Sequence, residues 1–220
     1  AIPDPALPDA GFVASHHVYD APHDPILNAC ERLNMRNRES DHVQVVFVPA
    51  MLDGNDGFLD MPYFEVLSAC DVGVFPSWYE PWGYTPHESA AYGVPTVTTD
   101  LSGFGIWARE RENFEGERQG VTVLPRRMAG YDETVVALRD ILLAYAACPV
   151  QELDARRRAV RALAAHASWN DFFPLYLQAY RRAGEKADLR GKRLIGARQR
   201  ESLSRVLSVK SATTPFLRRL

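Results

Sequence analysis

Long apolar runs are missing from this sequence. No segment approaches the roughly 18 consecutive apolar residues that a membrane-crossing helix needs. The first residues, AIPDPALPDA, also lack the basic and apolar regions of a secretory signal peptide. We therefore expect a soluble protein with no membrane partner.

Cysteine is scarce, and no metal-binding pattern is present. The three cysteines, Cys30, Cys70 and Cys148, are odd in number and scattered, without the ligand spacing of a zinc site. Free, scattered thiols are typical of a reducing compartment, so we expect a cytoplasmic protein. The segment Asp53-Gly-Asn-Asp lacks the spacing and the terminal glutamate of a calcium loop. We expect neither a metal ion nor a bound cofactor.

Acidic residues are few near the end of the chain. The net charge of −3 divides into +9 for residues 181–220 and −12 for the rest. We expect residues 1–184 to form one folded domain and residues 185–220 to form a basic, Ser- and Arg-rich tail. Basic charge is also typical of nucleic-acid binding, but no recognised nucleic-acid module accompanies it, so we expect no nucleic-acid partner.

The stretch from Asp71 to Gly105 carries the most informative pattern in the sequence. Two short runs rich in β-branched residues, 71–76 and 94–98, predict buried strands. Between them, Thr85-Pro86-His87-Glu88 has the form of a capping box, in which Thr85 and Glu88 each bond the backbone of the other. The pattern predicts a helix that begins at Thr85 and ends near Tyr92.

A helix that begins just beyond a parallel strand directs free N–H groups and its positive dipole end into the ligand crevice of an α/β sheet. The loop that leads into this helix carries Glu80 and also Gly83, which would let the backbone approach a phosphate closely. The stretch therefore predicts a ligand that bears phosphate.

The remaining pattern alternates strands and helices. It predicts further strands at 11–14, 43–48 and 121–124, and helices at 24–38, 60–70, 106–111, 132–147, 151–166 and 169–182. Asp24 and Asp132 are the expected caps of two of these helices. Arg126 and Arg127 follow a strand end, where a guanidinium faces either the ligand or solvent. We expect an α/β fold, a Rossmann-like parallel sheet flanked by helices.

The run from Val74 to Gly105, with its YEPWGYTPxE core followed by VPTVTTDLSGFG, resembles the glycogen synthases of the animal and fungal type. These are retaining glucosyltransferases of the GT-B fold. The resemblance extends more loosely from about His16 to about Tyr180. It implies transfer of glucose from UDP-glucose to the end of an α-1,4-glucan, with this chain as the donor-binding half. The family's other, N-terminal Rossmann-like domain has no counterpart here, so we expect no transfer by the isolated chain and a homo-oligomer in the full-length protein.

The resemblance also implies roles for site residues. Glu80 and Glu88 match the family's E-x7-E pair, the first near the transferred glucose and the second in support. Taken without the resemblance, Glu80 has no structural duty in its loop, whereas Glu88 has a capping duty. Double displacement would use Glu80 as the nucleophile, and same-face attack would use it only to stabilise and orient; both routes stay open.

Donor contacts are expected around the same loop. The resemblance implies that Tyr63 stacks on uracil, although an aromatic packed on its own helix is an equal alternative. Contacts with sugar and diphosphate are expected from Trp82, Gly83, Tyr84 and Thr85. Backbone N–H groups and the helix dipole would then stabilise the diphosphate without a metal.

A cluster of arginines in the second half of the sequence is a candidate site for a regulatory ligand. Arg156, Arg157, Arg158 and Arg161 lie on one predicted helix, where the plain interpretation is a solvated face with ion pairs. The resemblance implies glucose-6-phosphate as an effector. Two alternatives for the whole protein stay open: another GT-B glucosyltransferase that uses ADP-glucose or a different acceptor, and a non-catalytic module that binds nucleotide sugars.

Overall fold

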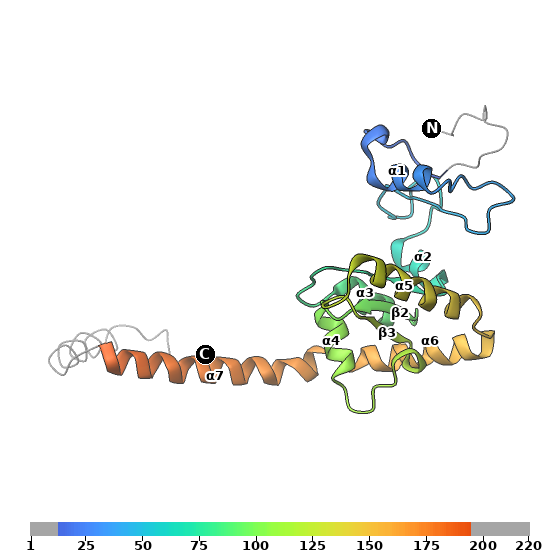
Figure 1. Ribbon diagram of the computed structural model, residues 1–220. Helices are drawn as coiled ribbons and strands as arrows, with labels where there is room; N and C mark the ends of the chain where they lie inside the picture. The colour runs from blue at the N-terminus through green and yellow to red at the C-terminus, as the bar shows by residue number, and fades with distance from the viewer. Residues whose placement is uncertain (1–12, 195–220) are drawn as a thin grey trace. The chain divides into compact units, whose positions relative to one another are not determined.

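The computed structural model describes residues 13–194. The chain divides into two compact units, Ala1–Leu163 and Ala164–Leu220, and each is described by itself. The helices are α1 (Pro25–Arg32), α2 (Tyr63–Ala69), α3 (Tyr84–Ala91), α4 (Gly103–Arg109), α5 (Tyr131–Ala146), α6 (Val150–Ala165) and α7 (Trp169–Leu194), with short 3₁₀ turns at Ala21–His23 and Gly116–Gln119. The strands are β1 (Gly73–Val74), β2 (Thr96–Thr99) and β3 (Val121–Leu124) (Figure 1).

The strands form one parallel sheet in the order β1-β2-β3. Val74 pairs with Val97, and Val97 pairs in turn with Thr122. Every connection between neighbouring strands contains a helix, as parallel pairing requires. The predicted α/β fold, a Rossmann-like parallel sheet flanked by helices, is confirmed.

The alternation of side chains along β2 builds the two faces of the core. Val97 packs with Leu124 and with Tyr145 of α5, and Leu153 of α6 joins this cluster. The threonines Thr96 and Thr98 are fully buried. Thr96 donates its hydroxyl to Ser89 of α3 at 2.9 Å, so its polar group is satisfied inside the core.

Helix caps agree with the sequence in one case and differ in two. The Asp24 carboxylate accepts from the N–H groups of Ile26 and Leu27 at 2.9 Å, which confirms the cap of α1. The predicted cap of α5 by Asp132 is wrong, because α5 begins at Tyr131 and its N-cap is Gly130. There the Glu133 carboxylate accepts from the Gly130 N–H at 2.9 Å. The second difference, at α3, belongs to the site and is described below.

The region before the sheet is more irregular than predicted. The run 43–48 is not a strand: it makes one bridge, between Ala14 and Phe47, and Val43 and Val46 are 59% and 54% exposed. β-Branched residues form a buried strand only when neighbouring strands cover them, and the described residues supply no others here. The helix expected to continue to Arg38 ends at Arg32, since Asn34 adopts a left-handed conformation with φ 56°.

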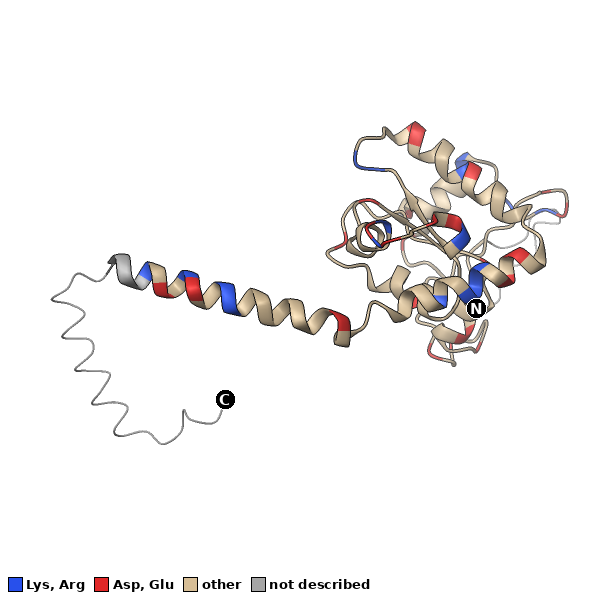
Figure 2. Ribbon diagram, turned by 90° about the horizontal axis from the view of Figure 1, so that it is seen from below, with Lys and Arg blue, Asp and Glu red and all other residues tan. Residues whose placement is uncertain are grey.

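The second unit contains α7, a helix of 26 residues that is longer than predicted. Its first half bears exposed apolar side chains such as Trp169 (69%) and Tyr180 (66%). Apart from Asp171 in the first turn, its charged residues follow Tyr180, and basic and acidic side chains are mixed there (Figure 2). The sequence-based boundary at residue 184 falls inside this helix, and the rest of the expected tail, 195–220, lies outside the described residues. Within residues 13–194, no helix has the length and apolar character to cross a bilayer.

Candidate functional site

Three loops meet at the carboxyl edge of the sheet. They follow β1 (75–83), β2 (100–102) and β3 (125–130). The loop after β1, which we call the donor loop, carries Glu80 and leads into α3. The Thr99 hydroxyl, at the end of β2, donates to the Ser77 carbonyl at 2.9 Å and so attaches the donor loop to the central strand. This edge is where open α/β sheets bind ligands.

Glu80 is fixed through its main chain and keeps its carboxylate free. Its N–H donates to the Leu101 carbonyl at 3.2 Å, and its carbonyl accepts from the Gly103 N–H at 3.0 Å. The side chain is half-buried, and among the described residues its carboxylate has neither a hydrogen bond nor an ion pair. A carboxylate on a fixed backbone with unused acceptor sites is suited to contact a ligand.

The residues after β2 support the donor loop. A Cβ on Gly103 would overlap the Pro81 carbonyl, so only glycine permits this approach. The Ser102 hydroxyl donates to the Trp82 carbonyl at 3.1 Å, and the Phe104 N–H donates to the same carbonyl. The first turn of α4 therefore serves as the base on which residues 80–82 lie.

The predicted capping box at Thr85 is wrong. Helix α3 begins at Tyr84, and its N-cap is Gly83, in a left-handed conformation with φ 97°. The Gly83 carbonyl already accepts the His87 N–H at 3.2 Å, which places Thr85 inside the first turn. Without the box, Glu88 loses the structural duty that the sequence assigned to it.

The N-terminus of α3 offers open donors. In the part of the chain that the structure describes, the backbone N–H groups of Tyr84 and Thr85 have no acceptor, and Pro86 has no N–H. Both residues are exposed. Two free amides at the positive end of a helix dipole are suited to bind an anion.

Tyr63 and Glu88 lie near each other on α2 and α3. Burial and, secondarily, the negative charge of Glu88 raise the pKa of the Tyr63 hydroxyl. The ring is 37% exposed, and it contacts Phe64, which stacks on Tyr92 with 4.6 Å between ring centres. The partly exposed Tyr63 ring is suited to stack on a planar base, and this contact stays a prediction.

Trp82 contacts other aromatic rings. Its ring centre lies 5.9 Å from that of Phe104 and 5.8 Å from that of Trp107. The indole N–H donates to Nδ1 of His87 at 3.2 Å. The side chain therefore fixes the donor loop to α3 and α4, and a direct contact between Trp82 and sugar or phosphate stays a prediction.

Sequence reasoning missed the contribution of Asp100. One oxygen of its carboxylate accepts from the backbone N–H groups of Arg126 and Arg127 at 2.8 and 2.9 Å. Arg126 turns toward the donor loop, where its guanidinium carbon lies 4.1 Å from the centre of the Trp78 ring. An aspartate directly after a buried strand was the available signal in the sequence.

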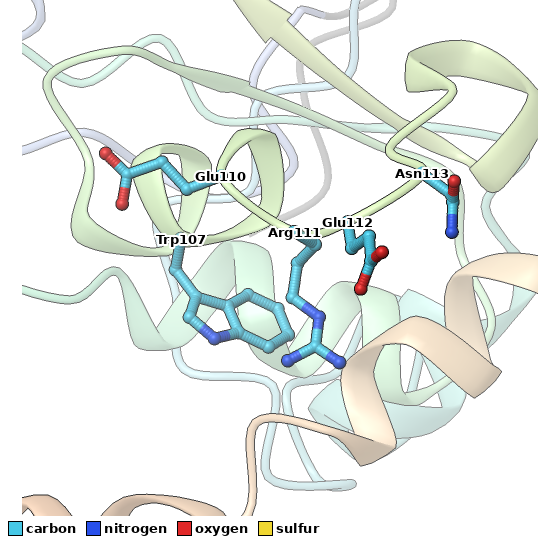
Figure 3. Close-up of a pocket in the computed structure, with 5 residues that line it drawn as sticks. All are labelled: Trp107, Glu110, Arg111, Glu112 and Asn113. Carbon is cyan, nitrogen blue, oxygen red and sulfur yellow. The ribbon is translucent and has the colours of Figure 1, made fainter.

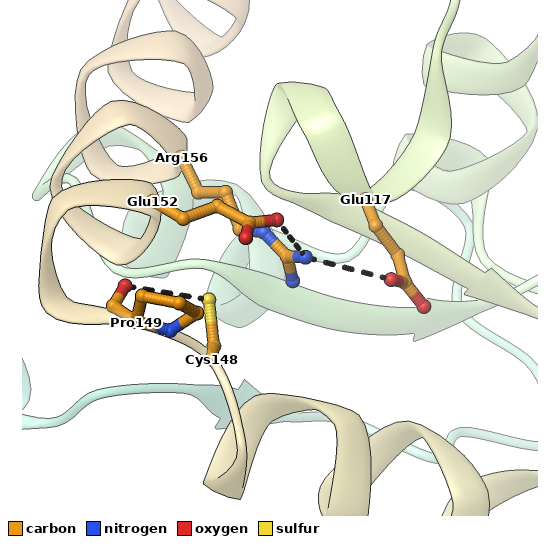
Figure 4. Close-up of polar contacts among 5 residues, drawn as sticks. All are labelled: Glu117, Cys148, Pro149, Glu152 and Arg156. Atoms are coloured by element: carbon orange, nitrogen blue, oxygen red, sulfur yellow. Dashed lines mark hydrogen bonds and ion pairs between the residues drawn. The ribbon is translucent and has the colours of Figure 1, made fainter.

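The basic cluster of α6 is largely engaged in packing. Arg156 is buried, pairs with Glu152 at 2.8 Å and lies 3.8 Å from Glu117 (Figure 4). Arg157 pairs with Asp71 at 3.0 Å, and Arg161 donates to the Ala91 carbonyl. These contacts fasten α6 to the sheet unit, and an effector role stays a prediction.

One hollow in the described structure lies away from the carboxyl edge. It has a volume of about 570 Å³ and is lined by Trp107, Glu110, Arg111, Glu112 and Asn113, at the end of α4 opposite Gly103. Figure 3 shows the Trp107 ring and the Arg111 guanidinium side by side, with Glu110 directed away from them. None of the predicted site residues lines it. Among the described residues, no three His, Cys, Asp or Glu side chains lie together so that they could hold a metal ion.

Comparison with known proteins agrees with the motif. The family model described as glycogen synthase matches residues 6–213. Glycogen (starch) synthase isoform 1 of Saccharomyces cerevisiae is 40% identical over 131 residues, 59% of this chain and 18% of the yeast protein. The liver enzyme of Mus musculus is 38% identical over 133 residues, 60% of this chain and 19% of its own length.

A relative from Caenorhabditis elegans extends the match. Its glycogen (starch) synthase is 32% identical over 174 residues, 79% of this chain and 26% of the worm protein. The matched region thus spans only about a fifth to a quarter of the curated relatives' length. Because the family model covers nearly the whole sequence, the chain belongs to the glycogen synthase family.

Proposed function

We propose that this chain is the donor-binding half of a retaining glucosyltransferase that transfers glucose from UDP-glucose to the end of an α-1,4-glucan. The observation that carries the proposal is the pairing of a free Glu80 carboxylate, on a backbone bonded at both sides, with the open amides of Tyr84 and Thr85. The amides bind the diphosphate, and Glu80 acts at the transferred glucose. Family membership supports both assignments.

The chemistry needs a leaving group whose growing negative charge is stabilised. Fixed N–H groups at a helix N-terminus provide this stabilisation without reorganising during the reaction. Tyr63 stacks on the uracil ring, and burial together with the nearby charge of Glu88 raises the pKa of its hydroxyl. A second domain, expected from the resemblance, supplies the acceptor surface and additional cations. The cytoplasm is the proposed compartment.

Donor preference tests the proposal. We expect the full-length protein to bind UDP at least about tenfold more tightly than ADP in calorimetry, a difference of about 1.4 kcal/mol, because a site built for one base leaves polar groups unpaired with the other. We also expect glucose transfer from UDP-glucose to a glucan.

Two outcomes would contradict the proposal. Preference for ADP would assign the protein to the ADP-glucose-dependent GT-B enzymes. Tight UDP binding without transfer by the full-length protein would indicate a nucleotide-sugar-binding module that has no turnover.

A further inference from the structure

We infer that Arg126 is a positioning residue that sets the place of Glu80 through Trp78 and Pro76. This inference rests on the proposed function. It concerns a side chain at the end of β3 that reaches across the carboxyl edge of the sheet to the loop after β1. No charged group of the substrate is needed for this role.

The backbone of Arg126 has a fixed position. Its N–H and that of Arg127 both donate to one oxygen of the Asp100 carboxylate, at 2.8 and 2.9 Å. Asp100 follows β2 directly and donates its own N–H to the Leu124 carbonyl of β3 at 3.2 Å. The backbone from which the Arg126 side chain extends is therefore held in place at the ends of β2 and β3.

The guanidinium of Arg126 contacts the donor loop at two points. Nη1 donates to the Pro76 carbonyl, and the guanidinium carbon lies 4.1 Å from the centre of the Trp78 ring. Nε is buried and has no partner among the described residues. A guanidinium over an indole face is the most favourable cation–π arrangement, and it orients both groups.

These contacts restrain the part of the donor loop that lacks other support. Ser77 is bonded to Thr99, and Glu80 is bonded to Leu101 and Gly103, whereas Trp78 between them is 66% exposed. Arg126 contacts Trp78, two residues before Glu80, in this gap. A misplacement of about 1 Å in a catalytic group is enough to cost about 100-fold in rate, so a restraint here matters for transfer.

The test compares Arg126→Gln with Arg127→Gln in the full-length protein. Arg127 is the matched control, because the one hydrogen bond of its guanidinium to a described residue is to the Asp100 carbonyl, at 3.3 Å. R126Q should lower kcat by about 10- to 100-fold with the Kd for UDP within about twofold, whereas R127Q should change neither by more than about twofold. Loss of UDP affinity in R126Q would show that Arg126 binds the diphosphate itself, and an unchanged kcat would show that it positions nothing; either result overturns the inference.

Trp78 variants provide an independent arm in case R126Q does not fold. W78F keeps a ring for the guanidinium and should retain kcat within about threefold. W78L removes the ring and should lower kcat by about 10- to 100-fold, the loss expected of R126Q. In the double variant R126Q/W78L the two losses should not add, because each removes the same contact. Full additivity of the two losses would overturn the inference.

Hydrogen exchange separates this inference from the proposed function. The amide of Glu80 should exchange about tenfold faster in R126Q than in the unmodified protein, and R127Q should leave it unchanged. This readout needs no turnover, so it remains decisive even if the protein transfers no glucose. Equal exchange rates in R126Q and the unmodified protein would overturn the inference.

Discussion

Replacing Glu80 with glutamine is expected to lower the rate of glucose transfer by about 10³-fold, with the Kd for UDP within about twofold. Glutamine keeps the size of the side chain but removes the negative charge, which stabilises the positive charge that develops on the sugar. Because the Glu80 carboxylate has no partner in the described structure, its replacement should leave folding unchanged. Initial rates with UDP-glucose and calorimetry with UDP measure the two quantities.

The matched control for Glu80 is Glu110→Gln. Glu110 is an exposed glutamate at the C-terminal end of α4, away from the donor loop. We expect it to leave both rate and affinity within about twofold of the unmodified protein, as is usual for surface substitutions. Turnover of E80Q near that of E110Q would remove Glu80 from the catalytic site.

Replacing Gly83 with alanine should be the most damaging small substitution in the site. Gly83 has φ 97°, and an added Cβ would lie 2.6 Å from Oγ of Ser102 and 3.0 Å from Cγ of Pro86. The positive φ costs an alanine about 1–2 kcal/mol, and overpacking adds about 1–3 kcal/mol. We expect the free energy of unfolding to fall by about 3 kcal/mol or more, and UDP affinity to fall with it, because the turn places the amides of Tyr84 and Thr85.

Urea unfolding and UDP calorimetry test this expectation against a matched glycine. Gly57 also has a positive φ, 76°, but an added Cβ there meets no atom of the described residues within 4 Å. G57A should therefore show only the cost of the positive φ, about 1–2 kcal/mol, with normal UDP affinity. Equal losses in G83A and G57A would mean that the close approach of Gly83 to Ser102 and Pro86 has no role.

Local patterns predicted the sheet well but not the region before it. The strand at 121–124 has the predicted bounds, and Asp24 caps α1 as expected. The run 43–48 is as rich in β-branched residues as the true strands, yet its one bridge to a described residue is the one to Ala14. Composition favours an extended chain, but a strand also needs neighbours, which a local pattern does not reveal.

The start of α3 shows a second limit. Thr85 and Glu88 have the right spacing for a capping box, but the left-handed turn at Gly83 begins the helix earlier. The backbone of Gly83 passes close to Ser102, a residue from another loop, so that an added Cβ would lie 2.6 Å from its Oγ. The local capping signal alone therefore did not determine where the helix begins.

The sequence named candidate site residues, but it did not reveal the contacts that hold them in place. The motif predicted Glu80 and the amides of Tyr84 and Thr85 because their spacing is local. The bonds from Glu80 to Gly103 and from Arg126 to Pro76 join loops that follow different strands, so they become visible only once the sheet order is known. For the same reason the sequence left open whether the Arg126 guanidinium faces the ligand or solvent. In the structure it lies over the Trp78 ring.

The central claim is that the amides at the start of α3 bind the diphosphate of the donor. Hydrogen–deuterium exchange of residues 83–88 in the full-length protein, with and without saturating UDP, tests it most directly. The account predicts that UDP slows exchange at Tyr84 and Thr85 by about tenfold or more, because bound oxygens replace water as acceptors. Calorimetrically confirmed UDP binding with unchanged exchange at both amides would contradict it.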